Sequence, residues 1–288
     1  RFFRFLFQRK LTRRFFIAGL QQAIFFFLFV YVFFNLLWGL NYNRVGMARQ
    51  LGLDVQPYTT EDLDTLTRNL QNRLNRYAGL VTGAERDSFN KKKVLFNGAF
   101  DAYRAAEKEY PFLAYSPRSI KPSLFSYAGN YLGFQGYYNP FSGEGQVNTT
   151  VPPFIEPFVT MHEIAHQLGY GKENEANFVA FLAGRHATHT HVRYSLYYDM
   201  YMYAIGELYL RDTARALAYR ESLHPQVQKD TREARAFFLK YKNAVEPVIT
   251  WGYSHFLRAN NQPAGKRTYN EVVTWLIAFY KKFGQDAL

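Results

Sequence analysis

Cysteine is absent from this 288-residue sequence, which excludes disulfide bonds and zinc sites built from thiolate ligands. Acidic residues are also absent from the first 49 positions, where eight basic residues occur: Arg1, Arg4, Arg9, Lys10, Arg13, Arg14, Arg44 and Arg49. Residues 50–288 carry 27 basic and 23 acidic groups, so most of the net charge of +12 lies beside one apolar segment. This distribution is typical of contact with lipid headgroups and argues against a nucleic-acid partner.

Charged residues of either sign are missing from residues 15–40, a run rich in phenylalanine. As a helix this run would extend about 39 Å, longer than the ~30 Å hydrocarbon core of a bilayer. We therefore expect a transmembrane helix over residues 15–40, with Trp38 and Tyr42 in the interfacial aromatic belt. A buried core helix and a cleaved signal peptide are the alternatives, and no small-residue cleavage site follows to favour the second.

The basic residues that flank this segment predict its orientation. Six precede it and two follow it closely, so the positive-inside rule makes residues 1–14 a basic cytoplasmic segment. The bulk of the chain is then expected on the extracytoplasmic side. Because the sequence begins with arginine and not with methionine, a further transmembrane helix can precede residue 1.

Helical periodicity dominates the rest of the chain. Thr59 or Thr60 is expected to cap a helix that reaches about Gly79, and its leucines share one face: Leu63, Leu66, Leu70 and Leu74. A second helix is expected from about residue 86 to residue 108. After Pro157, five or six further helical segments are expected.

Residues 123–150 have a different character, since glycine, tyrosine, phenylalanine and turn-forming residues dominate there. They predict a small β-region of hairpins, with a turn at NPFSGEG. The expected fold class is mainly α with a small β-region, forming one domain over residues 41–288 behind the transmembrane helix.

The segment MHEIAHQLG carries the strongest chemical signal of the sequence. His162 and His166 are four residues apart, so a helix places both imidazoles on one face, where they can bind one metal ion. Zinc accepts imidazole nitrogens, and a catalytic zinc site has three protein ligands and a water molecule. Glu163 is then expected to be the general base that takes a proton from this water.

The segment GKENEANF is expected to supply the third ligand. Glu173 and Asn177 are four residues apart, so Glu173 can bind the metal while Asn177 orients a histidine ligand. Glu175 lies on a different side of the same helix, and we prefer Glu173 while keeping Glu175 as the alternative. Acidic residues in the first turn of a helix are also stabilised by the helix dipole, so these glutamates can have a structural role without any metal.

Other side chains are weaker candidates. His186, His189 and His191 form a cluster that is interpreted as a polar loop, with metal binding as the alternative. Tyr194 and Arg193 are candidates for stabilising an oxyanion, because amide hydrolysis needs a hydrogen-bond donor at the carbonyl oxygen. We expect structural roles for two further histidines, His224 and His255.

The combination of HEIAHQ and NEAN resembles an uncharacterised bacterial family of membrane proteins, a domain of unknown function whose members combine transmembrane helices with an H-E-x-x-H region. The segment ENEAN is also similar to the third-ligand helix of gluzincin peptidases, which implies Glu173 as ligand and Asn177 as its partner. The chain departs from gluzincins in its short interval of seven residues between His166 and Glu173.

The resemblance further implies a zincin-like metallopeptidase domain at the outer face of a bacterial inner membrane, with one zinc ion per chain. A strand within residues 131–150 would then pair with an extended peptide substrate. In that strand region Glu144 and Asn148 are interpreted as either structural or substrate-facing.

The sequence thus predicts a membrane-anchored zinc metallopeptidase whose partners are a peptide or protein substrate and the lipid bilayer. Two alternatives remain open. One is an anchored binding protein with a structural metal and no catalytic activity. The other is a zinc amidase that acts on a cell-wall substrate, because a metal-activated water does not itself select the amide.

Overall fold

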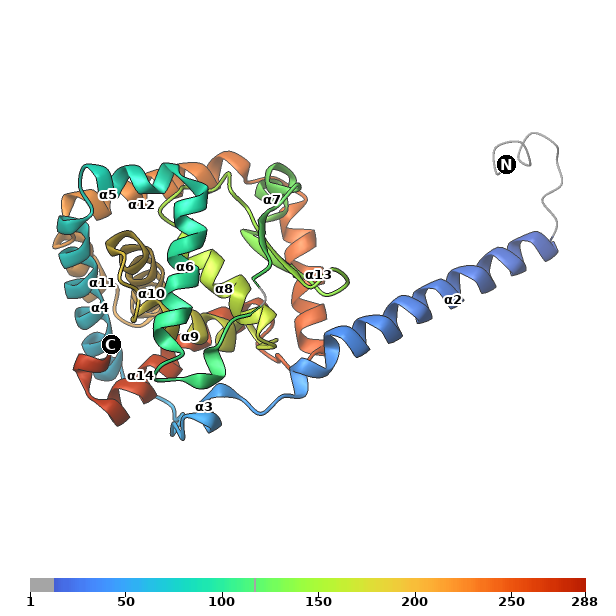
Figure 1. Cartoon of the computed structure of the whole chain (residues 1–288), viewed down its shortest axis with the longest axis horizontal. Helices are drawn as coiled ribbons and strands as arrows, with labels where there is room; N and C mark the ends of the chain where they lie inside the picture. Colours follow the sequence, from blue (N-terminus) through green and yellow to red (C-terminus); the bar gives the residue numbers. More distant parts are fainter. Residues whose placement is uncertain (1–12, 117) are drawn as a thin grey trace.

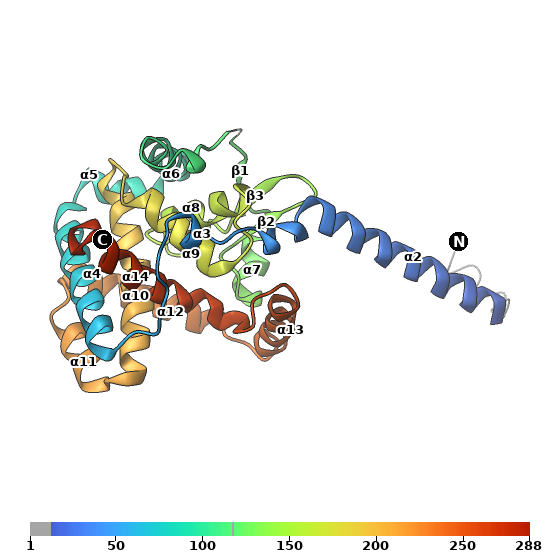
Figure 2. The ribbon, with the colours of Figure 1, turned by 90° about the horizontal axis from the view of Figure 1, so that it is seen from below.

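The computed structural model describes residues 13–116 and 118–288. One long helix, α2 (Arg13–Leu37), projects from a helical domain that contains the rest of the described chain (Figures 1 and 2). The expected cytoplasmic segment 1–14 falls outside the described residues except for Arg13 and Arg14, which begin α2. The helix ends at Leu37, three residues earlier than expected, and a 3₁₀ turn over Gly39–Asn43 follows it.

The domain is mainly helical, as expected, with a single small sheet among the described residues. Its helices are α3 (Met47–Gln50), α4 (Thr60–Leu80), α5 (Ala84–Asp87), α6 (Lys92–Ala106), α7 (Ser126–Leu132), α8 (Glu156–Gln167), α9 (Glu173–Gly184), α10 (Thr190–Arg211), α11 (Thr213–Glu221), α12 (Pro225–Tyr241), α13 (Glu246–Ala259) and α14 (Val272–Phe283). Further 3₁₀ turns lie at Ser88–Asn90, Pro111–Leu113, Gly265–Glu271 and Gln285–Ala287.

Helix α4 confirms the capping prediction. The Thr59 side chain accepts a hydrogen bond from the Asp62 amide while the Asp62 carboxylate accepts one from the Thr59 amide, a capping box. The four leucines of its apolar face are completely buried. This face packs mainly against α10, which crosses the domain beside it.

Two helix boundaries differ from the expectations. The helix expected from about residue 86 is divided into α5, a 3₁₀ turn and α6, which begins only at Lys92. The described chain after Glu156 contains seven α-helices instead of five or six, because Asp212 ends α10 and caps α11 by accepting a hydrogen bond from the Arg215 amide. A single aspartate within a helical sequence pattern does not by itself predict that one helix ends and another begins there.

The β-region is smaller than expected. Strands β1 (Ile120–Pro122), β2 (Gly136–Asn139) and β3 (Glu144–Val147) form a sheet in the order β1-β3-β2. β2 and β3 form the predicted antiparallel hairpin, in which Tyr137 pairs with Gln146, while β1 runs parallel to β3. Helix α7 occupies the place where a further hairpin was expected.

Helices α8 and α9 form the centre of the domain. Every residue of α9 is buried, and so are the first eleven residues of α8, Glu156 to His166. α6, α10 and the sheet pack around this pair. The predicted metal ligands therefore lie in the interior and not on a surface helix.

Candidate metal centre

Helix α8 presents His162 and His166 on one face, with their ring centroids 4.6 Å apart. The helix ends where Gly169 adopts a φ of +87°, a left-handed conformation that glycine takes without strain. A Cβ at this position would also meet the side chains of Arg44 and Asn41. The tight turn at residues 168–172 returns the chain to α8 and begins α9 at Glu173.

Glu173 lies directly between the two imidazoles. Its Oε2 is 3.1 Å from His162 Nε2 and 3.4 Å from His166 Nε2. The three ligand atoms lie within 4.8 Å of one another, and the three residues expose between 5% and 8% of their surface. The structure thus brings together the three residues that the sequence predicted as metal ligands.

The outer nitrogen of each imidazole has its own acceptor. His166 Nδ1 donates to the carbonyl oxygen of Tyr170 at 2.7 Å, and His162 Nδ1 lies 2.7 Å from Asn177 Oδ1. An acceptor at Nδ1 fixes the tautomer in which Nε2 carries a lone pair. Both lone pairs therefore point to the Glu173 carboxylate, an arrangement that requires a cation or a proton between them.

The pKa values of these groups reflect the same requirement. Burial disfavours the charge on His166, but the attraction and hydrogen bonding of Glu173 outweigh it and raise the pKa of His166 to about 9. Burial would raise the pKa of Glu173, yet the nearby imidazoles hold it well below its usual range. Both shifts favour positive charge among these three side chains.

Glu163 follows His162 directly along α8, and its side chain lies against the sheet. It is 3% exposed, and its Oε2 has no hydrogen-bond partner among residues 13–116 and 118–288. Burial raises its pKa to about 7, although the two histidines act in the opposite direction. In β2, a Cβ at Gly136 would collide with Glu163 Oε1, so the strand passes directly against this carboxylate.

The structure also separates the roles of the two candidate glutamates. Glu175 is turned toward the start of α3, where a Cβ at Gly46 would meet its Oε1, and toward Lys172 Nζ at 3.9 Å. It belongs to a different cluster of side chains from the two histidines. Of the two glutamates, Glu173 is the one that lies with the two histidines.

Residues far along the sequence support Glu173, and the motifs gave no signal for them. Tyr253 of α13 donates from its hydroxyl to Glu173 Oε1 at 2.7 Å. The Gln262 side-chain oxygen accepts from the Glu173 amide at 3.1 Å. Asn177 Nδ2 in turn donates to the Tyr203 hydroxyl at 3.3 Å. Among these, only Asn177 was expected.

The segment after α2 covers the centre. The Trp38 ring lies edge-on to His166 with centroids 5.8 Å apart, and it also packs against Tyr138 of β2. Trp38 and Tyr42 are 7% and 6% exposed, so the expectation that they lie in an interfacial belt is wrong. Because α2 ends at Leu37, both aromatic residues turn into the domain instead.

The two oxyanion candidates lie in other networks. The Tyr194 hydroxyl donates to Asp230 Oδ2 at 2.5 Å, and Asp230 also pairs with Arg86. Tyr194 is completely buried, so this prediction is corrected: its hydroxyl is committed to an internal ion pair and cannot meet a substrate. Arg193 donates to the Ala187 carbonyl and the Tyr77 hydroxyl.

The remaining histidines have individual partners. His186, His189 and His191 each lie near a different acid: Glu109, Asp101 and Glu85. His224 caps α12 by accepting from the Gln226 amide, a structural role as expected, and His255 bonds the Trp251 carbonyl within α13. The described residues hold one group suited to a metal, at α8 and α9.

Two polar residues of the sheet region have partners within the domain. Glu144 pairs with Lys121 across the β1–β3 boundary. Asn148 is completely buried and donates to the side chain of Asn130 and to the Phe134 carbonyl. Both side chains help to hold the strands in place, as the structural interpretation of the sequence expects.

Comparison with families of known proteins gives one match. Residues 1–277 match the model of a family described as a protein of unknown function, DUF3810. The chain belongs to this family. Neither the curated proteins nor the solved structures that were searched gave a match. Membership of DUF3810 confirms the predicted family of unknown function, while its description assigns neither a metal nor an activity.

Proposed function

We propose that this protein is a membrane-anchored zinc metallopeptidase with His162, His166 and Glu173 as ligands and Glu163 as general base. One observation carries the proposal. Two imidazoles, each with Nδ1 bonded to an acceptor, turn their Nε2 lone pairs toward one buried carboxylate. This is the arrangement of oriented histidine ligands that metal sites use.

The donor set fits zinc. Two neutral imidazoles and one carboxylate form the three-ligand set of catalytic zinc sites, which leaves a position for water. The absence of cysteine makes softer metals that prefer thiolates a poorer fit. We therefore propose one zinc ion per chain.

The roles of the residues follow from their positions. When bound, zinc lowers the pKa of its water and polarises a carbonyl oxygen. Glu163, the neighbour of His162 along α8, takes the proton of the attacking water and later donates it to the leaving amine. Tyr253 and Asn177 hold Glu173 and His162 in their orientations.

The edge of the sheet supports a peptide substrate. β2 is an edge strand in the order β1-β3-β2, and it passes beside Glu163 at Gly136. An extended peptide that pairs with such an edge would place its backbone amides near Glu163. This edge favours peptide bonds over other amides.

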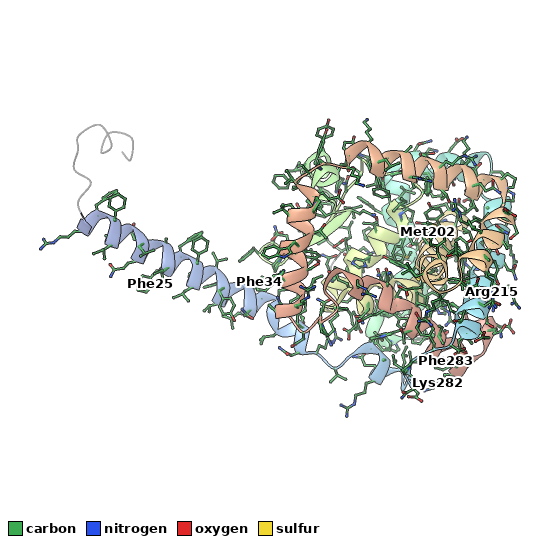
Figure 3. All side chains as sticks on the ribbon, turned by 180° about the vertical axis from the view of Figure 1, so that it is seen from behind. Phe25, Phe34, Met202, Arg215, Lys282 and Phe283 are labelled. Carbon is green, nitrogen blue, oxygen red and sulfur yellow. The ribbon has the colours of Figure 1, made fainter. Side chains whose placement is uncertain are left out.

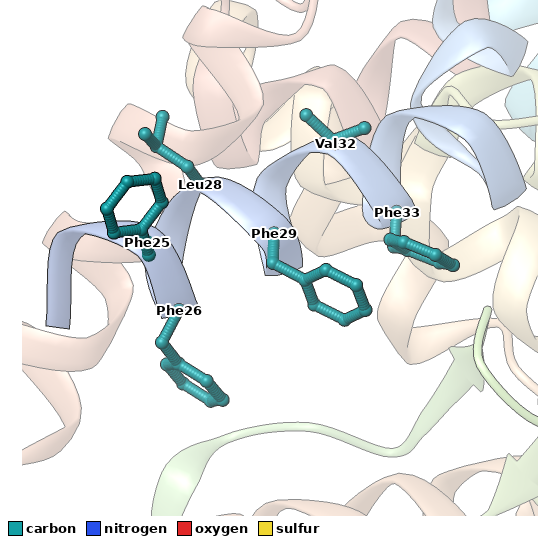
Figure 4. A pocket seen from close by; sticks show the side chains of 6 residues that line it. All are labelled: Phe25, Phe26, Leu28, Phe29, Val32 and Phe33. Atoms are coloured by element: carbon teal, nitrogen blue, oxygen red, sulfur yellow. The ribbon is translucent and has the colours of Figure 1, made fainter. Parts of the chain in front are cut away.

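Helix α2 supports the membrane anchor. Its segment Arg14–Leu37 is long and apolar enough to cross a bilayer, and none of its most apolar window is buried. Figure 4 shows phenylalanine, leucine and valine side chains that project from α2 on several sides, with no chemically reactive group among them. We propose that α2 crosses a bacterial inner membrane and that the domain lies on the extracytoplasmic side.

The test compares the full chain with Glu163→Gln in detergent micelles or vesicles. We expect the wild type to hydrolyse members of a broad peptide library after zinc loading, and the variant to lose at least about a hundredfold in kcat/KM. The variant should retain its zinc, because Glu163 is not a ligand. Equal activity in the two proteins would contradict the proposed mechanism, and activity on cell-wall fragments alone would favour the amidase.

A further inference from the structure

Helix α13 has an unusual surface for a helix of a water-exposed domain. Of its 14 residues only Leu257 is buried, while Val248, Ile249 and Trp251 expose 64%, 41% and 65% of their surfaces. A helix that exposes large apolar side chains along most of its length gains little from packing on the domain. The exposed apolar side chains of α13 therefore indicate that another apolar phase or surface covers this helix.

More exposed apolar side chains lie at the same end of the domain as α13. Leu124 and Phe125, just before α7, expose 95% and 61%, and Phe141 at the turn of the β2–β3 hairpin exposes 58%. We call the surface formed by these residues and those of α13 the anchor-side face: Leu124, Phe125, Phe141, Val248, Ile249 and Trp251. α7 and α13 contact each other, so Leu124 and Phe125 lie near α13, and the hairpin that carries Phe141 lies at the same end of the domain.

This face lies at the end of the domain from which α2 emerges. Figures 1 and 2 both show α7, α13 and the hairpin at this end, whereas α11 lies at the opposite end. Figure 3 shows the same separation, with Phe34 of α2 beside the domain and Arg215 of α11 on its far side. The ring of Phe34 packs against Phe256 of α13 with centroids 6.0 Å apart, so the apolar surface of α2 continues onto α13.

The charges around the face suit a lipid surface. Lys242 precedes α13 and Arg258 is in its last turn, and both are exposed. Glu246 is the acidic residue of the helix and lies in its first turn. Basic residues at the rim of an apolar helix face are attracted to anionic headgroups, while Trp and aliphatic side chains enter the interface.

We propose that the anchor-side face lies in the headgroup region of the bilayer that α2 crosses, with α13 parallel to the membrane surface. This inference goes beyond the proposed peptidase and rests only on its membrane anchor. The position of α13 also concerns the metal centre, because the hydroxyl of Tyr253 in α13 donates a hydrogen bond to Glu173. One helix then contacts both the lipid and a ligand, and the centre lies close to the bilayer surface.

The natural absence of cysteine allows a direct test by site-directed spin labelling. Single cysteines are introduced in the full chain at Val248 and Ile249, at Leu28 of α2 as the bilayer reference, and at Leu210. Leu210 is 77% exposed and lies at the end of α10, next to α11, which makes it a matched apolar control. Each labelled protein is reconstituted in vesicles of phosphatidylcholine and phosphatidylglycerol.

Collisions of the label with oxygen, which enters the bilayer, are compared with collisions with a water-soluble nickel complex. We expect the oxygen-to-nickel ratio of Val248→Cys and Ile249→Cys to exceed that of Leu210→Cys by at least about threefold, as interfacial insertion by several ångströms requires. Ratios equal to that of Leu210→Cys would overturn the inference. So would exclusion of both reagents, which would reveal a protein partner or a second copy on this face.

The reference position separates this inference from the proposed function. A bilayer signal at Leu28→Cys together with an aqueous signal at α13 would overturn the inference alone. An aqueous signal at Leu28→Cys would overturn the anchor, and the inference with it. Since the measurement involves neither zinc nor catalysis, loss of peptidase activity would not change its outcome.

Discussion

Glu156, in the first turn of α8, is a buried carboxylate outside the metal centre. It is 3% exposed, and its Oε2 has no hydrogen-bond partner in the described part of the chain. Burial raises its pKa from 4.5 to about 7, with Lys92 acting weakly against the shift. At the residue scale, such a group links the stability of the domain to pH.

The pKa of Glu156 predicts the sign of this dependence. Between pH 4.5 and about 7 the folded chain retains a proton that the unfolded chain releases, so the Glu156 contribution to stability is full below pH 4.5 and is lost as the pH rises toward 7. The shift corresponds to a loss on the order of 3 kcal/mol. The neutral side chain of Glu156→Gln should avoid this loss. As the pH rises from 5 to 8, the stability of the variant should therefore increase relative to that of the wild type.

Denaturant unfolding in detergent, repeated at these two pH values, measures the effect. The difference between the wild type and Glu156→Gln is the relevant quantity, because other buried carboxyl groups contribute equally to both proteins. Stability curves that run parallel over this range would show that Glu156 is ionised in the folded chain.

Single residues also show what sequence could and could not predict about the centre. His162, His166, Glu173 and Asn177 were predictable because each pair is four residues apart on one helix, where spacing alone determines the face. Tyr253 and Gln262 were not, since they reach Glu173 from about 80 to 90 positions away through tertiary packing. Tyr194 failed as a prediction because residue type alone does not reveal that Asp230 is its partner.

At the scale of elements, the contact between β2 and α8 matters most for the proposed chemistry. The strand passes so close to α8 that the carboxylate of Glu163 occupies the space in which a Cβ at position 136 would lie. The sequence predicted the hairpin from its turn residues, as the structure confirms. Its docking on α8 has no local signature, so the role of Gly136 became visible only in three dimensions.

Gly136→Ala tests this contact. The added methyl group must displace either Glu163 or β2, and a shift of about 1 Å in a catalytic group can lower activity on the order of a hundredfold. We expect kcat/KM for the peptide substrate to fall at least about tenfold while zinc content stays at the wild-type level. Steady-state kinetics with metal analysis of the same samples provides both values.

Gly206→Ala in α10 is the matched control, because a Cβ there meets no atom within 4 Å. This variant should keep wild-type activity and gain up to about 1 kcal/mol of stability from the better helix propensity of alanine. If Gly136→Ala were as active as this control, the close approach of β2 to Glu163 would have no functional importance.

At the scale of the whole molecule, helix α2 and the candidate metal centre form one unit. The chain leaves α2 at Leu37 and within a few residues places Trp38 against His166 and Tyr42 beside Phe256 of α13. Arg44 then donates to the Leu168 carbonyl at 2.6 Å, at the end of α8. The sequence predicted the apolar helix and the domain separately, but their direct packing depends on contacts over more than 120 residues.

This connection makes the metal content of the intact chain the central measurement. We expect the purified full-length protein to bind about one zinc ion, and His162→Ala, His166→Ala and Glu173→Ala to lose most of it. Glu175→Ala is the control from the same helical turn, since its carboxylate faces α3 and Lys172, and it should retain zinc.

The direct test is therefore elemental analysis of Glu173→Ala beside Glu175→Ala, with circular dichroism to confirm that both are folded. We expect zinc near one equivalent in Glu175→Ala and near zero in folded Glu173→Ala. Equal zinc content in the two variants, or no zinc in the wild type after exposure to the metal, would contradict the proposal that Glu173 is a zinc ligand.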